Sequence, residues 1–216
     1  MTVTSKIVAA ILAVLIVTAT PVATQLFAEE STRLNYVVAK TGIYNPTGDL
    51  DSFDTGLNIE GAFGRYFHKN FLIEGGVGLF GTEDDIQGTS AILGTYTETD
   101  TITAVPLTIT AKGILPLDKL ELFAGAGVGI YFTEVDAELN TSALGTFNVN
   151  DADIVMGVHV TGGGIYNFNE RFFFGIDGKY FSTEKAEYDG VILGRSITLK
   201  GDLTGYTVNG FFGYRF

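Results

Sequence analysis

Residues 205–216, with the sequence GYTVNGFFGYRF, decide the class of fold. Counting back by twos from Phe216 gives mostly apolar and aromatic residues, and the intervening positions are mostly polar or small. This period of two indicates a β-strand with one apolar and one wet face. In a soluble protein such an aromatic edge would invite aggregation, whereas a barrel in a bilayer needs an apolar outer face and has no edge. The stretch therefore favours a transmembrane β-barrel.

The same alternation recurs along the rest of the chain. It predicts an all-β fold, an eight-stranded antiparallel up-and-down transmembrane barrel. A soluble lipocalin-like barrel is the alternative, but its apolar side chains would face inward, and here the face opposite the aromatic residues carries charges and glycines. The other seven predicted strands are Leu34–Tyr44, Gly56–Phe67, Phe71–Phe80, Thr103–Ile114, Leu120–Thr133, Ile154–Tyr166 and Arg171–Ser182.

The connections alternate between short and long, as in barrels with short periplasmic turns and longer extracellular loops. Short connections are expected near His68–Asn70, Leu115–Lys119 and Asn167–Glu170. Four long connections are expected at residues 45–54, 82–100, 134–151 and 183–202, and they carry many of the acidic residues. Pieces such as Ala143–Thr146 and Leu193–Arg195 resemble hairpin tips, so some strands are expected to extend beyond the membrane.

The first 28 residues have the pattern of a cleaved signal peptide. Lys6 precedes the apolar run Ile7–Val17, which is too short to span a bilayer. Cleavage after Ala28 is expected, with Ala23 as the alternative. The mature outer-membrane barrel domain would then be residues 29–216, exported through the Sec pathway to the outer membrane of a Gram-negative cell.

Composition narrows the possible partners. The chain has no cysteine, so disulfides do not hold the fold together. Removing Lys6 with the leader leaves 12 basic and 25 acidic side chains, a net charge of −13. Such an acidic protein is not expected to bind nucleic acid, although divalent cations could bridge it to lipopolysaccharide.

Charged residues on the wet faces of the strands are expected to point into the barrel. Four bases face four acids, a balance that suits a plugged interior held by salt bridges. The functional alternative is a proton or ion path through the same residues. His159 also points inward and is expected to be a hydrogen-bonded core residue. The charged set is Lys40, Lys112, Lys179 and Arg215 with Glu60, Glu74, Glu121 and Asp177.

Stripes of inward glycines, such as Gly125–Gly127–Gly129, leave room for large side chains on neighbouring strands. Phe123, Tyr131 and Phe173 are the expected occupants. None of these glycine runs has the following helix of a dinucleotide-binding loop.

The sequence gives little sign of catalysis or of metal binding. A lipid hydrolase of this size would place a serine two positions from a histidine on the same strand face. Neither histidine of this chain has such a serine. The acids Asp49, Asp51 and Asp54, and the run Glu83–Asp85, lack the other ligands of a calcium loop. We therefore expect no enzyme, no cofactor and no metal site.

The chain contains the segments Gly42–Asp49, Phe53–Gly56, Gly64–Phe67 with Asn70, Glu74–Gly78 and Ala124–Gly129, and it ends in Gly213–Phe216. Together they resemble the opacity-like, OmpX- and OmpA-type family of small outer-membrane β-barrels. The ending Gly213–Phe216 resembles the signal read by the barrel-assembly machinery, with Tyr214 and Phe216 as its aromatic residues. The resemblance implies the fold over nearly all of the mature chain and brings no active-site residues.

Two functions remain open at this stage. The first is a structural or surface-interaction protein of the adhesin or antigen kind, with a closed interior and acidic extracellular loops. The second is a narrow OmpW-like channel for small solutes. A third, more remote hypothesis is a subunit of a larger envelope complex. Expected partners are outer-membrane lipid and lipopolysaccharide, the assembly machinery during insertion, and an extracellular partner that the sequence does not identify.

Overall fold

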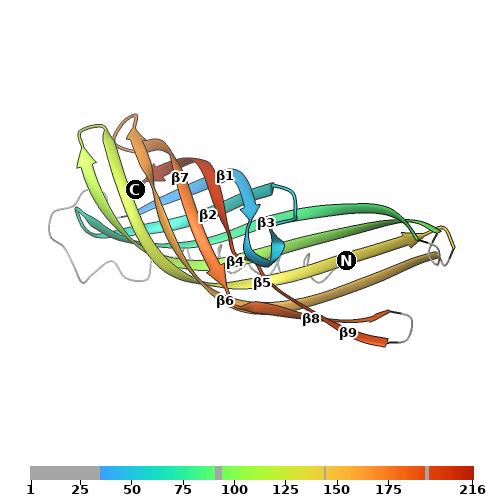
Figure 1. Ribbon diagram of the computed structural model, residues 1–216. Coiled ribbons are helices and arrows are strands. Elements are labelled where there is room, and N and C mark those ends of the chain that lie inside the picture. Colours follow the sequence, from blue (N-terminus) through green and yellow to red (C-terminus); the bar gives the residue numbers. More distant parts are fainter. Residues whose placement is uncertain (1–34, 91–93, 144, 193–194) are drawn as a thin grey trace. The chain divides into compact units, whose positions relative to one another are not determined.

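The computed structural model describes residues 35–90, 94–143, 145–192 and 195–216 (Figure 1). The predicted signal peptide, Leu34, and Leu144, Leu193 and Gly194 of the predicted hairpin tips lie outside the described residues. Among the described residues, no helix has the length and apolar content of a membrane span.

Eight antiparallel strands close into a barrel, which confirms the predicted fold class. The ring runs β1-β10-β7-β6-β5-β4-β3-β2, and β1 closes it by pairing with both β2 and β10. Apart from the closing pair β1–β10, neighbours in the ring follow one another in the chain, and a separate hairpin lies between β7 and β10. The barrel strands are β1 Asn35–Pro46, β2 Gly56–His68, β3 Phe71–Ser90, β4 Gly94–Leu117, β5 Leu120–Thr141, β6 Gly145–Asn167, β7 Phe172–Thr183 and β10 Gly205–Arg215.

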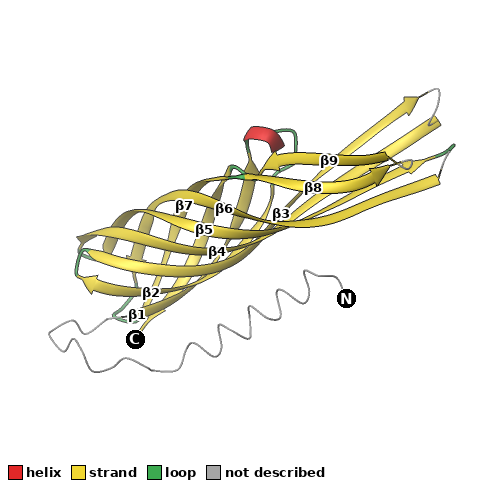
Figure 2. Ribbon diagram, turned by 90° about the horizontal axis from the view of Figure 1, so that it is seen from below, coloured by secondary structure: helices red, strands yellow, loops and turns green. Residues whose placement is uncertain are grey.

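Four strands are longer than the sequence pattern predicts. Sequence analysis predicts residues 82–100 and 134–151 as long connections into which some strands extend. The structure confirms the extension, because these residues continue the ladders of β3–β4 and β5–β6 over most of their length. They contain no proline and many β-branched residues, so the strands extend without a break. Figure 2 shows β3–β6 projecting beyond the barrel. We call residues 83–101 and 134–154 the extracellular sheet.

The remaining two long connections are structured as well. Residues 183–202 form a two-stranded hairpin, β8 Lys185–Ile192 and β9 Arg195–Asp202, paired from Lys185↔Asp202 to Ile192↔Arg195. Between β1 and β2 lies a short 3₁₀ turn, η1, at Gly48–Leu50. At the opposite end the three short turns lie where the sequence predicts them; Asp118 takes a positive φ of 59° in the turn between β4 and β5.

Pro106 interrupts one ladder of the wall. The β3–β4 register stops at Val77↔Leu107 and resumes at Phe80↔Ala104. Proline has no N–H to donate, so pairing is lost locally. The Pro106 ring instead lies close to Gly78, where an added Cβ would be 3.3 Å from Pro106 Cγ.

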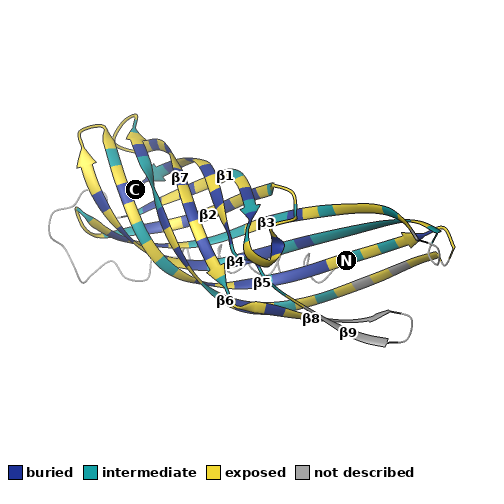
Figure 3. Cartoon of the chain, in the orientation of Figure 1, coloured by how far each residue is buried: buried dark blue, intermediate teal, exposed yellow. Residues whose placement is uncertain are grey.

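Side chains alternate between buried and exposed along each strand of the barrel (Figure 3). In β7 the alternation holds at every residue from Phe172 to Ser182. The exposed positions carry large apolar side chains, which only a lipid environment accommodates over a whole barrel surface. Ile59, Ile109, Val128, Val160 and Ile176 are examples, each more than half exposed.

Aromatic rings gather on the outer surface near the short turns. Tyr214 packs against Phe172 and Phe216, with ring centroids 5.2 and 6.2 Å apart. Tyr166 and Phe168 form a second group nearby, 5.8 Å apart. This is the position of an aromatic girdle at a membrane interface.

Inward glycines provide space for inward aromatic rings on the neighbouring strand. Gly213 pairs directly with Phe173, and a methyl group on Gly213 would lie 2.1 Å from Phe173 Cζ. Gly163 pairs with Phe123 in the same way, and a methyl group on Gly163 would lie 2.7 Å from Phe123 Cζ. At these two positions the narrow barrel holds a large ring because the facing residue has no side chain.

We predict that Gly213→Ala lowers the free energy of unfolding by about 1–3 kcal/mol, because Phe173 must leave its position. Gly210→Ala is the matched control in the same strand, since nothing lies within 4 Å of its added Cβ. Urea titration in lipid vesicles, followed by heat-modifiable gel mobility, measures both. Equal midpoints for the two variants would contradict the packing argument.

Candidate functional site

A buried charge network centred on Lys40 occupies the middle of the barrel. Lys40 Nζ lies 2.8 Å from Glu60 Oε1, 3.0 Å from Glu74 Oε1 and 3.2 Å from Asp177 Oδ2. These residues come from β1, β2, β3 and β7, so the network joins opposite sides of the ring. All four side chains are almost fully buried.

Two further lysines complete this network. Lys112 Nζ lies 2.7 Å from Glu74 Oε1, and Lys179 contacts Glu60 Oε2. Three lysines thus face three acids, and their charges cancel. A buried charge is costly unless it is paired, so a neutral network is the arrangement that a narrow interior tolerates.

Amides and hydroxyls surround the charges. Asn58 donates to Asn209 Oδ1 at 2.7 Å, and Asn209 donates to Asp177 Oδ1 at 2.8 Å. The Tyr36 hydroxyl donates to Glu74. His159 Nε2 lies 2.8 Å from Thr110 Oγ1, while its buried Nδ1 has no hydrogen-bond partner among the described residues.

Arg215 and Glu121 form a separate group near the short turns. Arg215 Nη2 donates to Glu121 Oε2 at 2.9 Å, and its Nη1 donates to Asn167 at 2.5 Å. Asn167 in turn donates to Glu121 Oε1 at 2.9 Å. The structure thus divides the predicted interior charges into two groups. Asn167, which sequence analysis assigned to a turn, connects the second.

Aromatic rings pack between these two groups. The Arg215 guanidinium carbon lies 4.7 Å from the Phe173 ring centroid, and Lys112 Nζ lies 4.7 Å from that of Phe123. Tyr36 and Phe211 also contact Phe173, with centroids 5.6 and 6.4 Å away. The cavity left among these side chains measures about 10 Å³, roughly the space for one water molecule.

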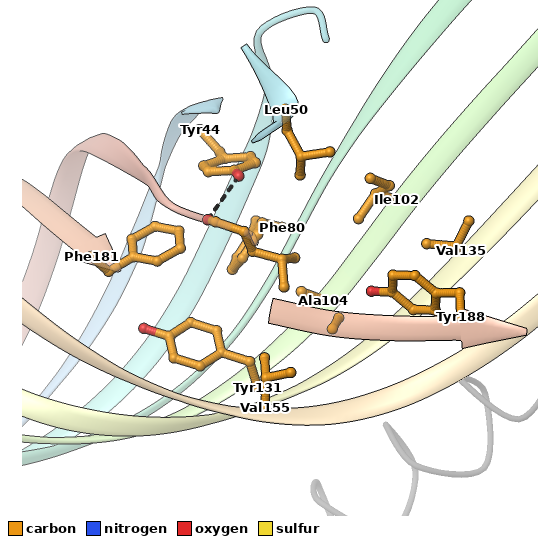
Figure 4. Close-up of a cluster of buried hydrophobic side chains, with 12 residues drawn as sticks. Tyr44, Leu50, Phe80, Ile102, Ala104, Tyr131, Val135, Val155, Phe181 and Tyr188 are labelled. Carbon is orange, nitrogen blue, oxygen red and sulfur yellow. Dashed lines mark hydrogen bonds between the residues drawn. The ribbon is translucent and has the colours of Figure 1, made fainter. Parts of the chain in front are cut away.

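A second aromatic layer covers the charge network on its extracellular side (Figure 4). Tyr44, Phe80, Tyr131 and Phe181 pack with ring centroids 4.5–6.4 Å apart. Sequence analysis did not identify Phe80 or Phe181 as inward residues. The strand alternation could have done so, because Phe80 shares the phase of Glu74 and Phe181 that of Lys179.

The loops fold over this layer and are held together. Leu50 of η1 and Leu203 join the apolar cluster, and the Tyr44 hydroxyl donates to the Leu203 carbonyl at 3.1 Å (Figure 4). Outside the cluster, Lys185 Nζ lies 2.9 Å from Asp49 Oδ2. The hydrogen bond from Lys185 holds the pKa of Asp49 below its ordinary value, and the same contact raises the pKa of Lys185.

The extracellular sheet concentrates the negative charge of the protein. Its residues include ten acids and no lysine, arginine or histidine. On the face that continues the outer surface, Thr99 and Thr101 of β4 each lie between an acidic residue of β3 and one of β5. Thr99, for example, donates to Asp85 Oδ1 at 2.7 Å and is paired with Glu138 on its other side.

The hairpin β8–β9 packs against the base of this sheet. The Tyr188 hydroxyl donates to Thr133 Oγ1 at 2.8 Å, and the Glu187 amide donates to Asp153 Oδ2 at 2.9 Å. In the described part of the chain, no group of three or more His, Cys, Asp or Glu residues has an arrangement that could hold a metal ion.

A closed ring of eight antiparallel strands with an apolar outer surface and a polar, filled interior defines a small integral outer-membrane β-barrel. The model of the outer membrane protein beta-barrel domain family matches residues 9–216, and the chain belongs to this family. It is therefore an outer-membrane protein of the Gram-negative type, surrounded by membrane lipid. Among curated proteins, none matches the chain.

Solved structures show the same fold at low sequence identity. Neisserial surface protein A aligns with a TM-score of 0.53 at 10% identity, covering 84% of this chain and 97% of that one. OprG from Pseudomonas aeruginosa aligns with a TM-score of 0.56 at 14% identity, covering 85% of this chain and 96% of that one. A major outer membrane protein from Thermus thermophilus aligns with a TM-score of 0.52 at 13% identity, covering 86% of this chain and 100% of that one.

We predict that Lys40→Met lowers the free energy of unfolding by about 3–5 kcal/mol, because it leaves three buried carboxylates without their shared cation. Lys200→Met is the control: Lys200 pairs with Glu187 at the surface, where both side chains are more than half exposed, so little change is expected. Urea titration in lipid vesicles compares them. Equal midpoints would mean that the network does not stabilise the barrel.

Proposed function

We propose that the protein is a surface-interaction protein, in which a sealed barrel anchors an acidic extracellular sheet. The observation that carries this proposal is the filled interior. An aromatic layer lies on each side of the central charge network, and the cavity left beside that network is about 10 Å³. A barrel without an open path has its accessible surfaces in its loops.

The same observation weighs against the alternative, a narrow OmpW-like channel. A solute would have to displace the rings of Tyr44, Phe80, Tyr131 and Phe181 and then break a neutral network of salt bridges. The loops add a further barrier, because Leu50 and Leu203 pack onto that aromatic layer.

The shape and charge of the extracellular sheet support a role in contact with other molecules. Four strands continue beyond the ring, and ten acids lie on them with no base. Holding such a charge on an ordered sheet costs electrostatic free energy, which a positively charged partner would offset.

The proposal also covers export, insertion into the membrane, chemical activity and contact with lipid. Residues 1–28 act as the signal peptide, and the Tyr214 and Phe216 rings serve as the assembly signal. In this proposal the mature protein is not an enzyme and takes no cofactor. Contact with lipopolysaccharide takes place on the outer surface at the loop end of the barrel, where the exposed rings of Tyr180 and Tyr206 lie at paired positions.

We predict that residues 29–216, refolded into planar bilayers, give no discrete single-channel current. The filled interior leaves no continuous water path for ions. Heat-modifiable gel mobility confirms folding, and a known porin in the same bilayer is the positive control. Reproducible current steps that change in Lys112→Ala or Glu121→Ala would contradict the proposal and favour the channel.

We also predict that trimming the extracellular sheet abolishes adherence. Replacing residues 85–99 and 136–150 each by Asn-Gly joins directly paired positions through two-residue hairpin turns and leaves the barrel intact. Cells displaying the trimmed protein should adhere to immobilised proteins and polysaccharides no better than cells without it. Unchanged adherence with a folded trimmed barrel would contradict a role for the sheet.

A further inference from the structure

The extracellular sheet has an open edge along β3. The β2–β3 pairing ends at Leu57↔Gly81, and beyond it the Asp54 amide donates to the Glu83 carbonyl at 3.1 Å. Among the described residues, no strand pairs with the β2-facing side of residues 84–89. This segment therefore presents one side of its main chain to solvent.

The main-chain groups on this edge can be assigned. The Glu83 carbonyl points away from β4, toward Asp54. In a strand, alternate residues direct their N–H and C=O groups to the same side. Asp85, Gln87 and Thr89 therefore direct their N–H and C=O groups to the open edge. These main-chain groups do not bond to β4.

The surroundings of the edge are negative on both faces of the sheet. Glu83 and Asp85 lie on one face, and Asp84 lies directly across from Asp100 on the other. Like charges paired across strands are destabilising. Burial raises the pKa of Asp100, and the negative charges of Glu98 and Asp84 raise it further.

The edge also has an apolar position. Ile86 lies between Asp84 and Gly88 on the second face, and 44% of its surface is exposed. A strand added to β3 would place its own side chains beside Ile86 on this face and beside Asp85 on the other.

We propose that the β3 edge, residues 83–89, binds an extended lysine- or arginine-rich segment of another protein by strand addition. This inference rests on the proposed surface-interaction function and names the partner of that surface. The main-chain groups of Asp85, Gln87 and Thr89 supply hydrogen bonds to the added strand, and the acids around them select positive charge.

A second copy of this chain is a poorer occupant. Pairing two β3 edges would bring together two sheets that each carry ten acids and no base. The other open edge of the extracellular sheet, along β6, is partly covered, because β8 packs beside Asp153 and the Glu184 amide bonds the Met156 carbonyl at 2.8 Å.

The test measures binding of a fluorescent ten-residue peptide of alternating lysine and valine to the full mature chain in uncharged lipid nanodiscs. We expect saturable binding that weakens as salt is raised. A peptide of alternating glutamate and valine should not bind. No binding of the lysine peptide to folded protein would overturn the proposal.

Gln87→Pro separates edge pairing from simple charge attraction. It removes the central N–H of the open edge without removing a bond to β4, so binding should weaken at least about tenfold. Asn148→Pro is the matched control, because the Asn148 N–H points to the β6 edge, in phase with Met156. Asp85→Asn should weaken binding about two- to fivefold.

Equal binding by wild type and Gln87→Pro would overturn the proposal in favour of attraction to the sheet face. A dimer of the wild-type protein that Gln87→Pro abolishes would assign the edge to a second copy instead. Cell adherence separates the proposed β3-edge site from the surface-interaction function on which it rests. If trimming the sheet abolishes adherence and Gln87→Pro does not, the surface-interaction function stands and the β3 edge is not its site.

Discussion

Main-chain hydrogen bonding between β1 and β10 is the constraint on which the structure depends. A bilayer offers no water to unpaired N–H and C=O groups, so a sheet can cross it only as a closed ring. The pairing from Tyr36↔Arg215 to Pro46↔Gly205 makes that closure. Once the ring is closed, every barrel strand has one face toward lipid and one toward the interior, and the alternation of the sequence follows.

Closure with eight strands also determines how the interior is filled. The ring is narrow, so inward side chains meet across it. Lys40 can reach acids on β2, β3 and β7 at once, and the Phe173 ring occupies the space left by the missing side chain of Gly213. Charge balance and glycine placement are thus two consequences of one small diameter.

The constraint ends where the membrane ends. In water, β3–β6 can continue as an open sheet, because solvent satisfies the groups that lipid would leave unpaired. An open edge is also a risk for aggregation, and charged side chains are a common protection against it. The acids around β3 have this effect between copies of the protein, and the same charge selects the kind of partner that could pair with the edge.

The sequence by itself determined the class of fold and the phase of each strand. Period-two alternation placed Lys40, Glu60 and Asp177 inside and the aromatic girdle outside, because side-chain direction in a strand is a local property. It assigned residues 82–100 and 134–151 to long connections. Pieces that resemble hairpin tips indicated that some strands extend beyond the membrane, but not how far, because turn-forming and acidic residues mask a weaker alternation. Only the tertiary structure decided which residues meet. The contacts of Lys40 with Asp177 and of Arg215 with Asn167 join strands that are distant in the chain. They depend on strand order, register and barrel diameter, which closure of the whole ring sets together. The open edge of β3 has the same origin, because it exists where β2 stops and β3 continues.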